Sequence, residues 1–523
     1  MLSDNARRPA SDAGAVLLIN PQMSRRASAR IPLSVLHLAA VLEGQRPWQI
    51  LDGNLGPIVL SALEALRARP HAFVGVTVMP GPQVVTAIAI SAAIRAAFPE
   101  VPIGWGGYFP TLYPASAINA PYVDYLIRGQ GEGTLLELLD RLPAAGAPTA
   151  RDSATDARAM EDVRGLTWKR DGAAVHNPER AVIPPETFPR LPYERVDMKA
   201  YLLTTFMGRR TAVHQHALGC RFKCGFCGVV SMWNGTTLLD GPARLDESLR
   251  TLRDRWGADG VQFFDHNFFD REETSLPVLD VLAKLAMPWW CYARADTMAR
   301  FSTSTWETLR RSRLRMAYIG AETSSDDVLS RMHKGSRVDH TLEVTARCRE
   351  AGVIPELSFV LGGPGDPEAE IENTFRFIRK IKSLHPSAEI ILYFYSPTPQ
   401  VDRVALRKDK GALHLPILET YGPSGPGLPT TPEGWAEERW VRWVCHEDAP
   451  WLTPRTRQRV KDFARVLACR FPTVQDHRAP RWGKALLQNL SRIRYATGKY
   501  GRPIELRIGQ RLLGLRDPKS ESL

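Results

Sequence analysis

The first 145 residues alternate short apolar runs with longer segments of helical periodicity. The apolar runs lie at 15–20, 48–53, 72–79, 101–107 and 123–129. Each run has the length of a buried strand, and the segments between them, such as 33–43 and 83–98, carry apolar residues at helical spacing. This alternation predicts an α/β, doubly wound, Rossmann-like domain over residues 1–145, whose ligands would lie beyond the carboxyl ends of the strands.

A second alternation of apolar runs and helical segments fills residues 206–400. Its runs lie at 212–218, 260–269, 289–296, 316–323, 355–363 and 389–397. Six strand and helix units in so short a stretch predict a partial (β/α)6 barrel of the TIM type rather than an open sheet. Reactive groups are expected at the carboxyl ends of its strands.

Two other regions lack this alternation. Residues 146–205 predict a linker with a β-hairpin at Asp171 and Gly172. Residues 401–523 predict a mainly helical, basic region, in which Trp435, Trp440, Trp443 and Trp451 are expected to cap the barrel mouth. A simple helical packing domain is the alternative.

Composition places the chain among folded proteins of enzyme size. Its 523 residues are 44% hydrophobic and 24% charged, and neither a secretory signal nor a membrane-spanning run is evident. Seven cysteines without an export signal predict a reducing, cytoplasmic location. In that setting, clustered thiols are more often metal ligands than disulfides.

Three cysteines are clustered where the first barrel strand ends. Cys220, Cys224 and Cys227 lie in the sequence GCRFKCGFCG, whose glycines argue against a helix that merely buries them in a core. Three thiolates on a short loop predict a 4Fe-4S cluster with one iron left open for a ligand. A zinc site is the alternative, and it would need His214, His216 or Cys291 as a further ligand.

These cysteines, with Phe226 directly before the last one and the barrel behind them, resemble the signature of the radical S-adenosylmethionine enzymes. Segments 265–269, 319–335 and 361–377 are similar to successive barrel strands of the subgroup that carries an N-terminal cobalamin-binding domain. In that domain the segments 17–21, 50–54, 105–111 and 128–132 match the expected order. Two features depart from the family: no D-x-H-x-x-G motif occurs, and Gln130 stands where R-G-E-G-E has a glutamate.

The resemblance implies three cofactors: a 4Fe-4S cluster, S-adenosylmethionine and cobalamin. The cluster would be held by the catalytic residues Cys220, Cys224 and Cys227. The residues expected to bind S-adenosylmethionine are Phe226, Asp265, Arg294, Glu322, Gly362 and Gly363. Those expected to bind cobalamin are Asn20, Thr77, Met79, Gly106, Gly107, Tyr108, Gly131 and Glu132.

Plainer interpretations exist for several of these residues. Arg294 and Glu322 could form an ordinary buried ion pair across neighbouring strands. Gly362 and Gly363 could form a simple turn. His266, next to Asp265, could carry a proton, although a surface histidine is the favoured interpretation.

The resemblance further implies an enzyme that methylates an unactivated carbon of a small-molecule substrate, either a natural product or a lipid-like compound. A cobalamin-dependent radical cyclase or rearranging enzyme is the alternative, and a non-catalytic iron-sulfur protein is a remote one. The expected partner is an electron donor of the flavodoxin or ferredoxin type, and no nucleic acid is expected.

Positive charge is concentrated in the tail. Residues 451–523 contain 17 Lys and Arg against 5 Asp and Glu, which accounts for the whole formal charge of +12. Within this tail, Trp482, Leu486, Leu487, Leu490 and Ile493 form an amphipathic pattern. A helix that faces the core is the favoured interpretation, and peripheral contact with an acidic membrane surface is the alternative.

Overall fold

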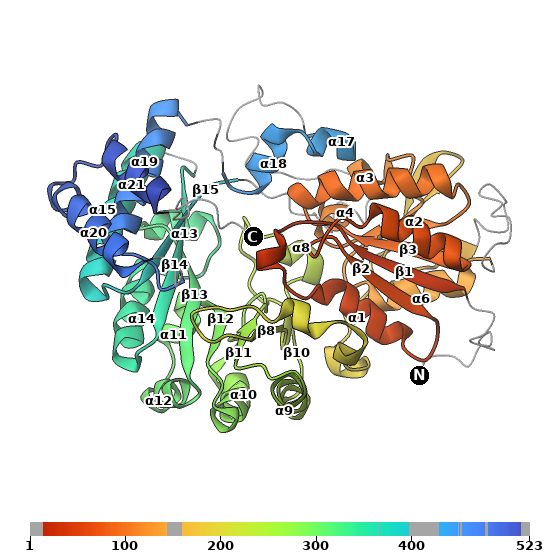
Figure 1. Cartoon of the computed structure of the whole chain (residues 1–523), viewed down its shortest axis with the longest axis horizontal. Helices are drawn as coiled ribbons and strands as arrows, with labels where there is room; N and C mark the ends of the chain where they lie inside the picture. Colours follow the sequence, from red (N-terminus) through yellow and green to blue (C-terminus); the bar gives the residue numbers. More distant parts are fainter. Residues whose placement is uncertain are drawn as a thin grey trace.

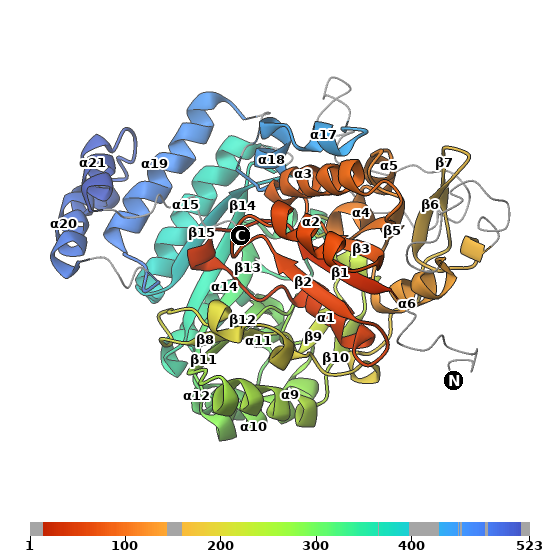
Figure 2. The same cartoon turned by 45° about the vertical axis from the view of Figure 1, so that its right-hand side comes forward.

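The computed structural model describes residues 14–143, 159–363, 366–396, 428–447, 449, 452–475 and 480–513. An N-terminal α/β domain lies beside a larger domain built on a second parallel sheet, and helices from the C-terminal region lie on both (Figure 1). The same arrangement is seen after a turn of 45° (Figure 2). Within the described residues, no helix is long and apolar enough to cross a membrane.

The N-terminal domain is built on a seven-stranded sheet with the order β2-β1-β3-β4-β5-β6-β7. The strands are β1 (Ala15–Asn20), β2 (Trp48–Asp52), β3 (His71–Thr77), β4 (Ile103–Gly106), β5 (Tyr125–Ile127), β6 (Leu166–Arg170) and β7 (Ala173–His176). The helices are α1 (Leu33–Leu42), α2 (Val59–Ala68), α3 (Pro82–Ala97), α4 (Tyr108–Leu112), α5 (Pro114–Ile118) and α6 (Glu132–Arg141). Strands β1 to β5 are parallel and lie where the apolar runs predict them.

The predicted hairpin forms, but it belongs to the N-terminal sheet. Strand β6 pairs antiparallel with β5, and β7 pairs antiparallel with β6 across the turn at Asp171 and Gly172. Leu166 and Trp168 pack on the same apolar cluster as Val16 and Phe73. The N-terminal sheet therefore extends into the region assigned from sequence to the linker.

The second domain is the predicted partial barrel. Its sheet has the order β15-β14-β13-β12-β11-β8, and every neighbouring pair is parallel. The strands are β8 (Thr211–His214), β11 (Gly260–Phe263), β12 (Trp289–Arg294), β13 (Leu314–Glu322), β14 (Ile354–Leu361) and β15 (Glu389–Phe394). A short antiparallel pair, β9 (Ala217–Gly219) and β10 (Thr237–Leu239), lies beside it.

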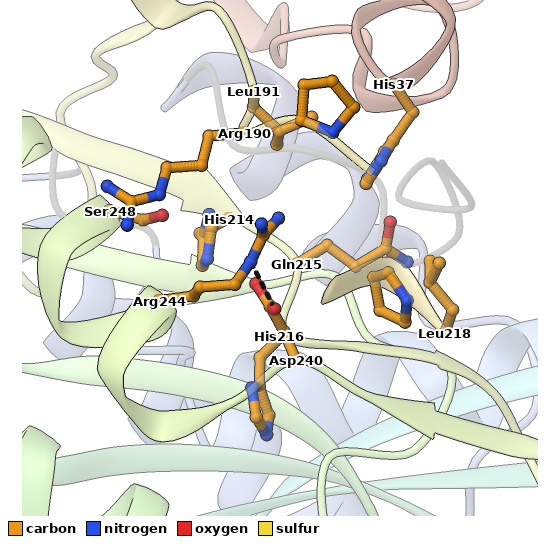
Figure 3. A pocket seen from close by; sticks show the side chains of 12 residues that line it. His37, Arg190, Leu191, His214, Gln215, His216, Leu218, Asp240, Arg244 and Ser248 are labelled. Carbon is orange, nitrogen blue, oxygen red and sulfur yellow. Dashed lines mark ion pairs between the residues drawn. The ribbon is translucent and has the colours of Figure 1, made fainter. Parts of the chain in front are cut away.

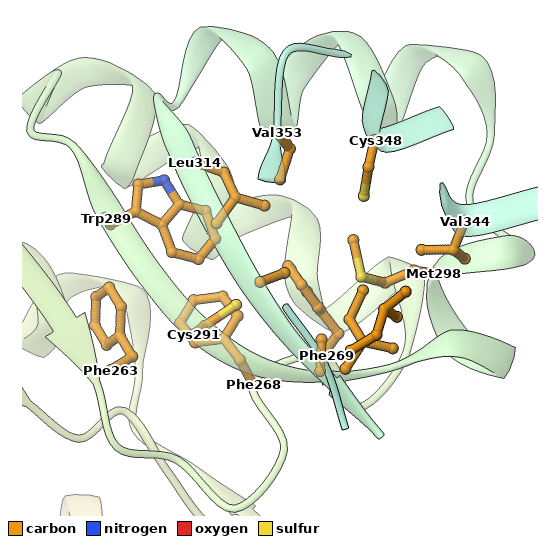
Figure 4. Close-up of a cluster of buried hydrophobic side chains, with 14 of the residues drawn as sticks. Phe263, Phe268, Phe269, Trp289, Cys291, Met298, Leu314, Val344, Cys348 and Val353 are labelled. Atoms are coloured by element: carbon orange, nitrogen blue, oxygen red, sulfur yellow. The ribbon is translucent and has the colours of Figure 1, made fainter. Parts of the chain in front are cut away.

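Helices between these strands cover the outside of the barrel (Figure 1). They are α9 (Pro242–Arg250), α10 (Glu272–Leu285), α11 (Ala295–Ala299), α12 (Thr303–Arg311), α13 (Asp326–Arg331), α14 (Val338–Ala351) and α15 (Pro367–Leu384). The short helix α8 (Val229–Trp233) lies instead at the junction with the N-terminal domain, where it contacts α4. The core between strands and helices is densely apolar and includes Cys291 and Cys348, both fully buried (Figure 4). Cys291 therefore serves as a small core residue and not as the further ligand that a zinc site would need.

The described part of the C-terminal region is mainly helical, as predicted. Its helices are α17 (Pro432–Trp435), α18 (Glu438–Val444), α19 (Pro454–Arg470), α20 (Arg481–Thr497) and α21 (Ile504–Leu512). Helix α19 packs on the barrel, where the rings of Phe463 and Phe375 stack with centroids 3.8 Å apart.

The tryptophans of this region do not cap the barrel mouth. Trp435, Trp440 and Trp443 pack into the apolar core of the N-terminal domain, and the Trp435 ring lies 4.1 Å from that of Tyr113. The expectation was wrong because spacing alone cannot identify the surface that an aromatic residue will contact. Trp451 lies outside the described residues.

The favoured interpretation of the tail helix was also wrong. Of its amphipathic pattern only Leu487 is buried, whereas Trp482 is 68% exposed and Ile493 is 73% exposed. The apolar stripe points away from the core because α20 contacts α19 and α21 through its opposite side.

Candidate functional site

The N-terminal sheet and the barrel meet at the carboxyl ends of their strands. Tyr108 follows β4, and its hydroxyl lies 2.7 Å from Nε2 of His266, which follows β11. Beside this contact the Thr111 hydroxyl donates to Sδ of Met232, so α4 packs on α8. The two predicted cofactor regions are therefore neighbours.

The cysteine loop runs between β9 and α8 and is held by residues that follow β11. The Asp265 carboxylate accepts hydrogen bonds from the amides of His216, at 2.7 Å, and Ala217. His266 Nδ1 accepts one from the amide of Gly219, at 3.0 Å. Asp265 thus fixes the start of the loop, and within the described residues its side-chain hydrogen bonds reach none of the other residues predicted to bind S-adenosylmethionine.

The three cysteine sulfurs influence one another, which places them together. Burial raises the pKa of the Cys227 thiol to about 12, with a further contribution from the thiols of Cys224 and Cys220. Burial likewise raises the pKa of Cys220. Three adjacent thiols on one loop, with Cys224 buried and the other two partly buried, fit a cluster whose irons would take them as thiolates.

Cations lie beside these sulfurs. Arg294, at the end of β12, places Nη1 3.2 Å from the Cys224 sulfur. Its guanidinium covers the Phe222 ring at 3.6 Å and forms an ion pair with Asp296, with Nε 2.9 Å from Oδ1. The positive charge of Arg294 suits an anionic cluster, because buried charges need compensation.

Lys334 connects Arg294 to the predicted residues on β13. Its backbone carbonyl accepts from Arg294, and its side chain forms a buried ion pair with Glu322. The ammonium also lies 5.6 Å from the centre of the Phe226 ring. Arg294 and Glu322 are therefore close together but do not pair with each other, which rules out the simple ion pair considered from sequence.

The backbone at Glu322 takes an uncommon conformation. Its φ is +64°, a left-handed region that residues other than glycine adopt uncommonly. A Cβ on Gly320 would lie 2.1 Å from Oε1 of Glu322 and 2.6 Å from Nζ of Lys334. Gly320 thus leaves room for the ion pair to fold across the strand end.

The end of β14 completes this group. Gly363 lies beside the side chain of Met332, which packs with Phe226 in a small apolar cluster. The amide of Gly362 donates to Glu370 at 3.4 Å, while Leu452 covers its α-carbon. Of the residues predicted to bind S-adenosylmethionine, Phe226, Arg294, Glu322 and Gly363 therefore gather around Lys334 and Met332.

The cobalamin residues predicted at β1 and β3 are joined by Gln83. Its amide nitrogen donates to Oδ1 of Asn20, at 2.9 Å, and its amide oxygen accepts from the amide of Met79, at 2.8 Å. The Thr77 hydroxyl lies 3.3 Å from that of Ser34. Gln83 is fully buried and was not identified from sequence, because a single glutamine on a helix carries no pattern.

Glycines form the adjoining end of β4. Gly106 ends the strand, and Gly107 has a φ of +97°, with the position of its missing Cβ only 3.2 Å from Oγ1 of Thr77. Backbone free of side chains at this strand end fits a bulky, flat ligand such as a corrinoid.

The end of β5 explains the departure at Gln130. Its side chain donates to the carbonyl of Ile183, at 2.9 Å, and accepts from the amide of Ile183, at 2.7 Å. A carboxylate could only accept, so the amide suits this double contact better than glutamate would. Next to it, Gly131 precedes α6, and burial raises the pKa of Glu132 to about 7.

A small pocket beneath α1 holds three histidines, shown in Figure 3 with the Asp240–Arg244 ion pair. Burial lowers the pKa of His37 and His216 to about 4 and that of His214 to about 3, so all three are neutral near pH 7.

No group of three His, Cys, Asp or Glu side chains in the described part of the chain is arranged to hold one metal ion. The zinc alternative therefore has no ligand set there. A 4Fe-4S cluster is a different case, because each cysteine binds a separate iron atom.

Aromatic side chains on neighbouring barrel strands form a group that the sequence did not indicate. It comprises Phe264, Trp290, Tyr292, Tyr318 and Tyr393. Trp290 donates to Glu356 at 3.1 Å, and Arg30 reaches from the N-terminal domain to Gln262. Tyrosines, a carboxylate and an arginine thus lie within or beside the barrel.

Comparison with known proteins gives a match for each domain. Residues 215–378 match the radical SAM superfamily, and residues 25–139 match the B12 binding domain. An uncharacterized methyltransferase, PH0819 of Pyrococcus horikoshii, is 22% identical over 67% of this chain and 73% of its own length. An anaerobic magnesium-protoporphyrin IX monomethyl ester cyclase of Synechocystis is 23% identical over 51% of each chain. This chain therefore spans only about half the length of that cyclase.

A solved structure has the same fold. The radical S-adenosylmethionine methyltransferase TsrM from Kitasatospora setae, with tryptophan and an S-adenosylmethionine analogue bound, superposes with a TM-score of 0.57. It is 17% identical, over 74% of this chain and 73% of its own. A second structure of TsrM contains cobalamin and a 4Fe-4S cluster.

The chain thus joins a B12-binding domain to a radical SAM domain, as predicted, and is a radical SAM enzyme. The two domains imply a 4Fe-4S cluster, S-adenosylmethionine and cobalamin as its cofactors.

Proposed function

We propose that this enzyme transfers a methyl group to an unactivated carbon of a small-molecule substrate. The proposal rests mainly on the contact between Tyr108 and His266, which brings the strand ends of the cobalamin domain against the cysteine loop. When bound, the cluster and S-adenosylmethionine supply radical chemistry and cobalamin supplies a methyl group. Because methylation of an unactivated carbon uses both cofactors on one substrate, their sites must be adjacent.

We assign roles to this chain's residues accordingly. Cys220, Cys224 and Cys227 hold the cluster, and Arg294 offsets its negative charge from beside Cys224. Glu322, held by Lys334, is oriented to bind the amino group of S-adenosylmethionine, since a buried carboxylate is a strong acceptor for a cation.

Radical cyclisation without methyl transfer is a second candidate, because cyclases are among the relatives found by comparison. It would need the same two domains and the same cysteines.

By-product analysis under reducing, anaerobic conditions distinguishes the two. Methylation predicts 5′-deoxyadenosine and S-adenosylhomocysteine together, with a product heavier by one methyl group. Deoxyadenosine alone, with no added methyl, would favour cyclisation. The triple variant Cys220→Ala/Cys224→Ala/Cys227→Ala should bind no cluster iron and yield no deoxyadenosine, and retention of both would refute the assignment of the cysteines.

A further inference from the structure

The two last helices of the described chain carry a concentrated apolar surface. Seven of the eleven large hydrophobic side chains that are exposed in the described residues belong to α20 and α21. They are Trp482, Leu486, Leu490 and Ile493 on α20, and Ile504, Ile508 and Leu512 on α21. Their spacing of three or four residues places them along one face of each helix. A patch so concentrated marks an interaction surface rather than scattered exposure.

These stripes are not the contact between the two helices. Gly483 packs on Leu513 and Gly509 packs on Leu487, and in each case a Cβ on the glycine would lie 2.7 Å from the leucine side chain. Leu487 and Leu506 are buried together against α19. The pair is therefore a packed unit whose inward faces are already satisfied, and the exposed stripes remain available.

Positive charge accompanies the stripes. Helix α20 contains no acidic residue, and α21 contains only Glu505, which forms an ion pair with Arg494. Arg492, Arg507 and Arg511 are exposed and form no ion pair within the described residues. By helical spacing, Arg507 and Arg511 flank the stripe of α21.

This positive charge argues against a second copy of this chain as the partner. In a symmetric dimer the same patch meets itself, so these arginines would face their own copies. The segments outside the described residues supply no excess of anions either: apart from the single residue Asp448, each carries at least as many Lys and Arg as Asp and Glu. An anionic lipid surface offers both an apolar phase and negative charge.

We propose that α20 and α21 form a peripheral docking surface for anionic phospholipid. The helices would lie in the plane of the membrane, with Trp482 and the aliphatic stripes below the headgroups and the arginines at the phosphates. In both views of the fold they stand at the end of the molecule opposite the N-terminal domain (Figures 1 and 2). Docking there would leave the junction of the two domains uncovered.

Vesicle sedimentation with the full chain tests this. We expect binding to vesicles of phosphatidylcholine and phosphatidylglycerol, weakened by salt, and little binding to phosphatidylcholine alone. The variant Leu486→Glu/Ile493→Glu should bind these vesicles at least about tenfold more weakly, because it places two carboxylates in the apolar stripe of α20. The control Leu60→Glu changes a leucine on α2 that is as exposed as Ile493, and this variant should bind normally.

A second variant separates charge from folding. Arg507→Glu/Arg511→Glu keeps every apolar side chain and should lose the preference for anionic vesicles, with an unchanged circular dichroism spectrum. Three results would overturn the proposal: no vesicle binding, equal binding to neutral vesicles, or a dimer in light scattering that the Leu486→Glu/Ile493→Glu variant abolishes. The last would identify a second copy of the chain as the occupant.

Discussion

Replacing Lys334 by methionine tests the centre of the proposed S-adenosylmethionine site. The Lys334 and Glu322 side chains are only 7% and 6% exposed. Removing one partner of a buried ion pair leaves the other charge uncompensated, which costs about 3–5 kcal/mol. Lys334→Met should therefore lower the stability of the apo-protein by that amount at pH 7, measured from urea denaturation midpoints.

Two further variants make this test specific. The double variant Lys334→Met/Glu322→Gln removes both charges and should regain most of the lost stability. Arg331→Met breaks an exposed ion pair with Asp327 on α13 and should cost less than about 1 kcal/mol. A double variant as unstable as Lys334→Met, or a single variant no worse than Arg331→Met, would refute the reasoning. Binding of S-adenosylmethionine, measured separately, should fall in both variants that lose Lys334.

Three other predictions address the cobalamin domain and its junction with the barrel. Gly107→Ala should lower the free energy of unfolding by about 1–3 kcal/mol, because φ is +97° at this position. It should also retain less hydroxocobalamin through gel filtration than the control Gly56→Ala, whose added Cβ would meet no other atom within 4 Å. Equal retention by the two variants would contradict the assignment of Gly107 to the cobalamin site. Burial raises the pKa of Glu132 from its ordinary value of 4.5 to about 7, so ionisation of this carboxyl destabilises the folded state as the pH rises between these values. Glu132→Gln should therefore have an unfolding free energy up to about 3 kcal/mol higher than that of the parent protein at pH 8 and an equal one at pH 4, judged from urea midpoints. A difference that does not depend on pH would count against burial as the cause. Tyr108→Phe removes the hydrogen bond to His266 and should slow methyl transfer about fivefold, which corresponds to the loss of about 1 kcal/mol. The formation of deoxyadenosine without substrate should not change. An equal loss of both activities would show that the substitution acts on the cluster instead.

The sequence predicted the strands well because parallel strands are buried on both faces. Residues 15–19, for example, are continuously apolar, and β1 lies there with every side chain buried. The cysteine loop was evident from its spacing. Lys334 and Gln83 could not be identified in this way, because each acts through a partner that is distant in sequence.

The sequence could not determine which surface an apolar pattern contacts. The stripe from Trp482 to Ile493 has the periodicity of a core helix, yet it is exposed, since α19 and α21 occupy the other side of α20. Periodicity reports the width of an apolar face, and its covering depends on elements far along the chain. The same limit explains why Trp435 was expected at the barrel mouth and is found in the N-terminal core.

The segment of α17 and α18 has a consequence for engineering. Its tryptophans complete the N-terminal core, while the Trp443 carbonyl accepts from Ser396, and the His446 carbonyl accepts from the amide of Phe394 on β15. A chimera that exchanges cobalamin domains between relatives must therefore transplant residues 428–446 together with the N-terminal domain. Without residues 428–446, the transplanted N-terminal domain would lack part of its own core, even though the two segments are encoded far apart in the gene.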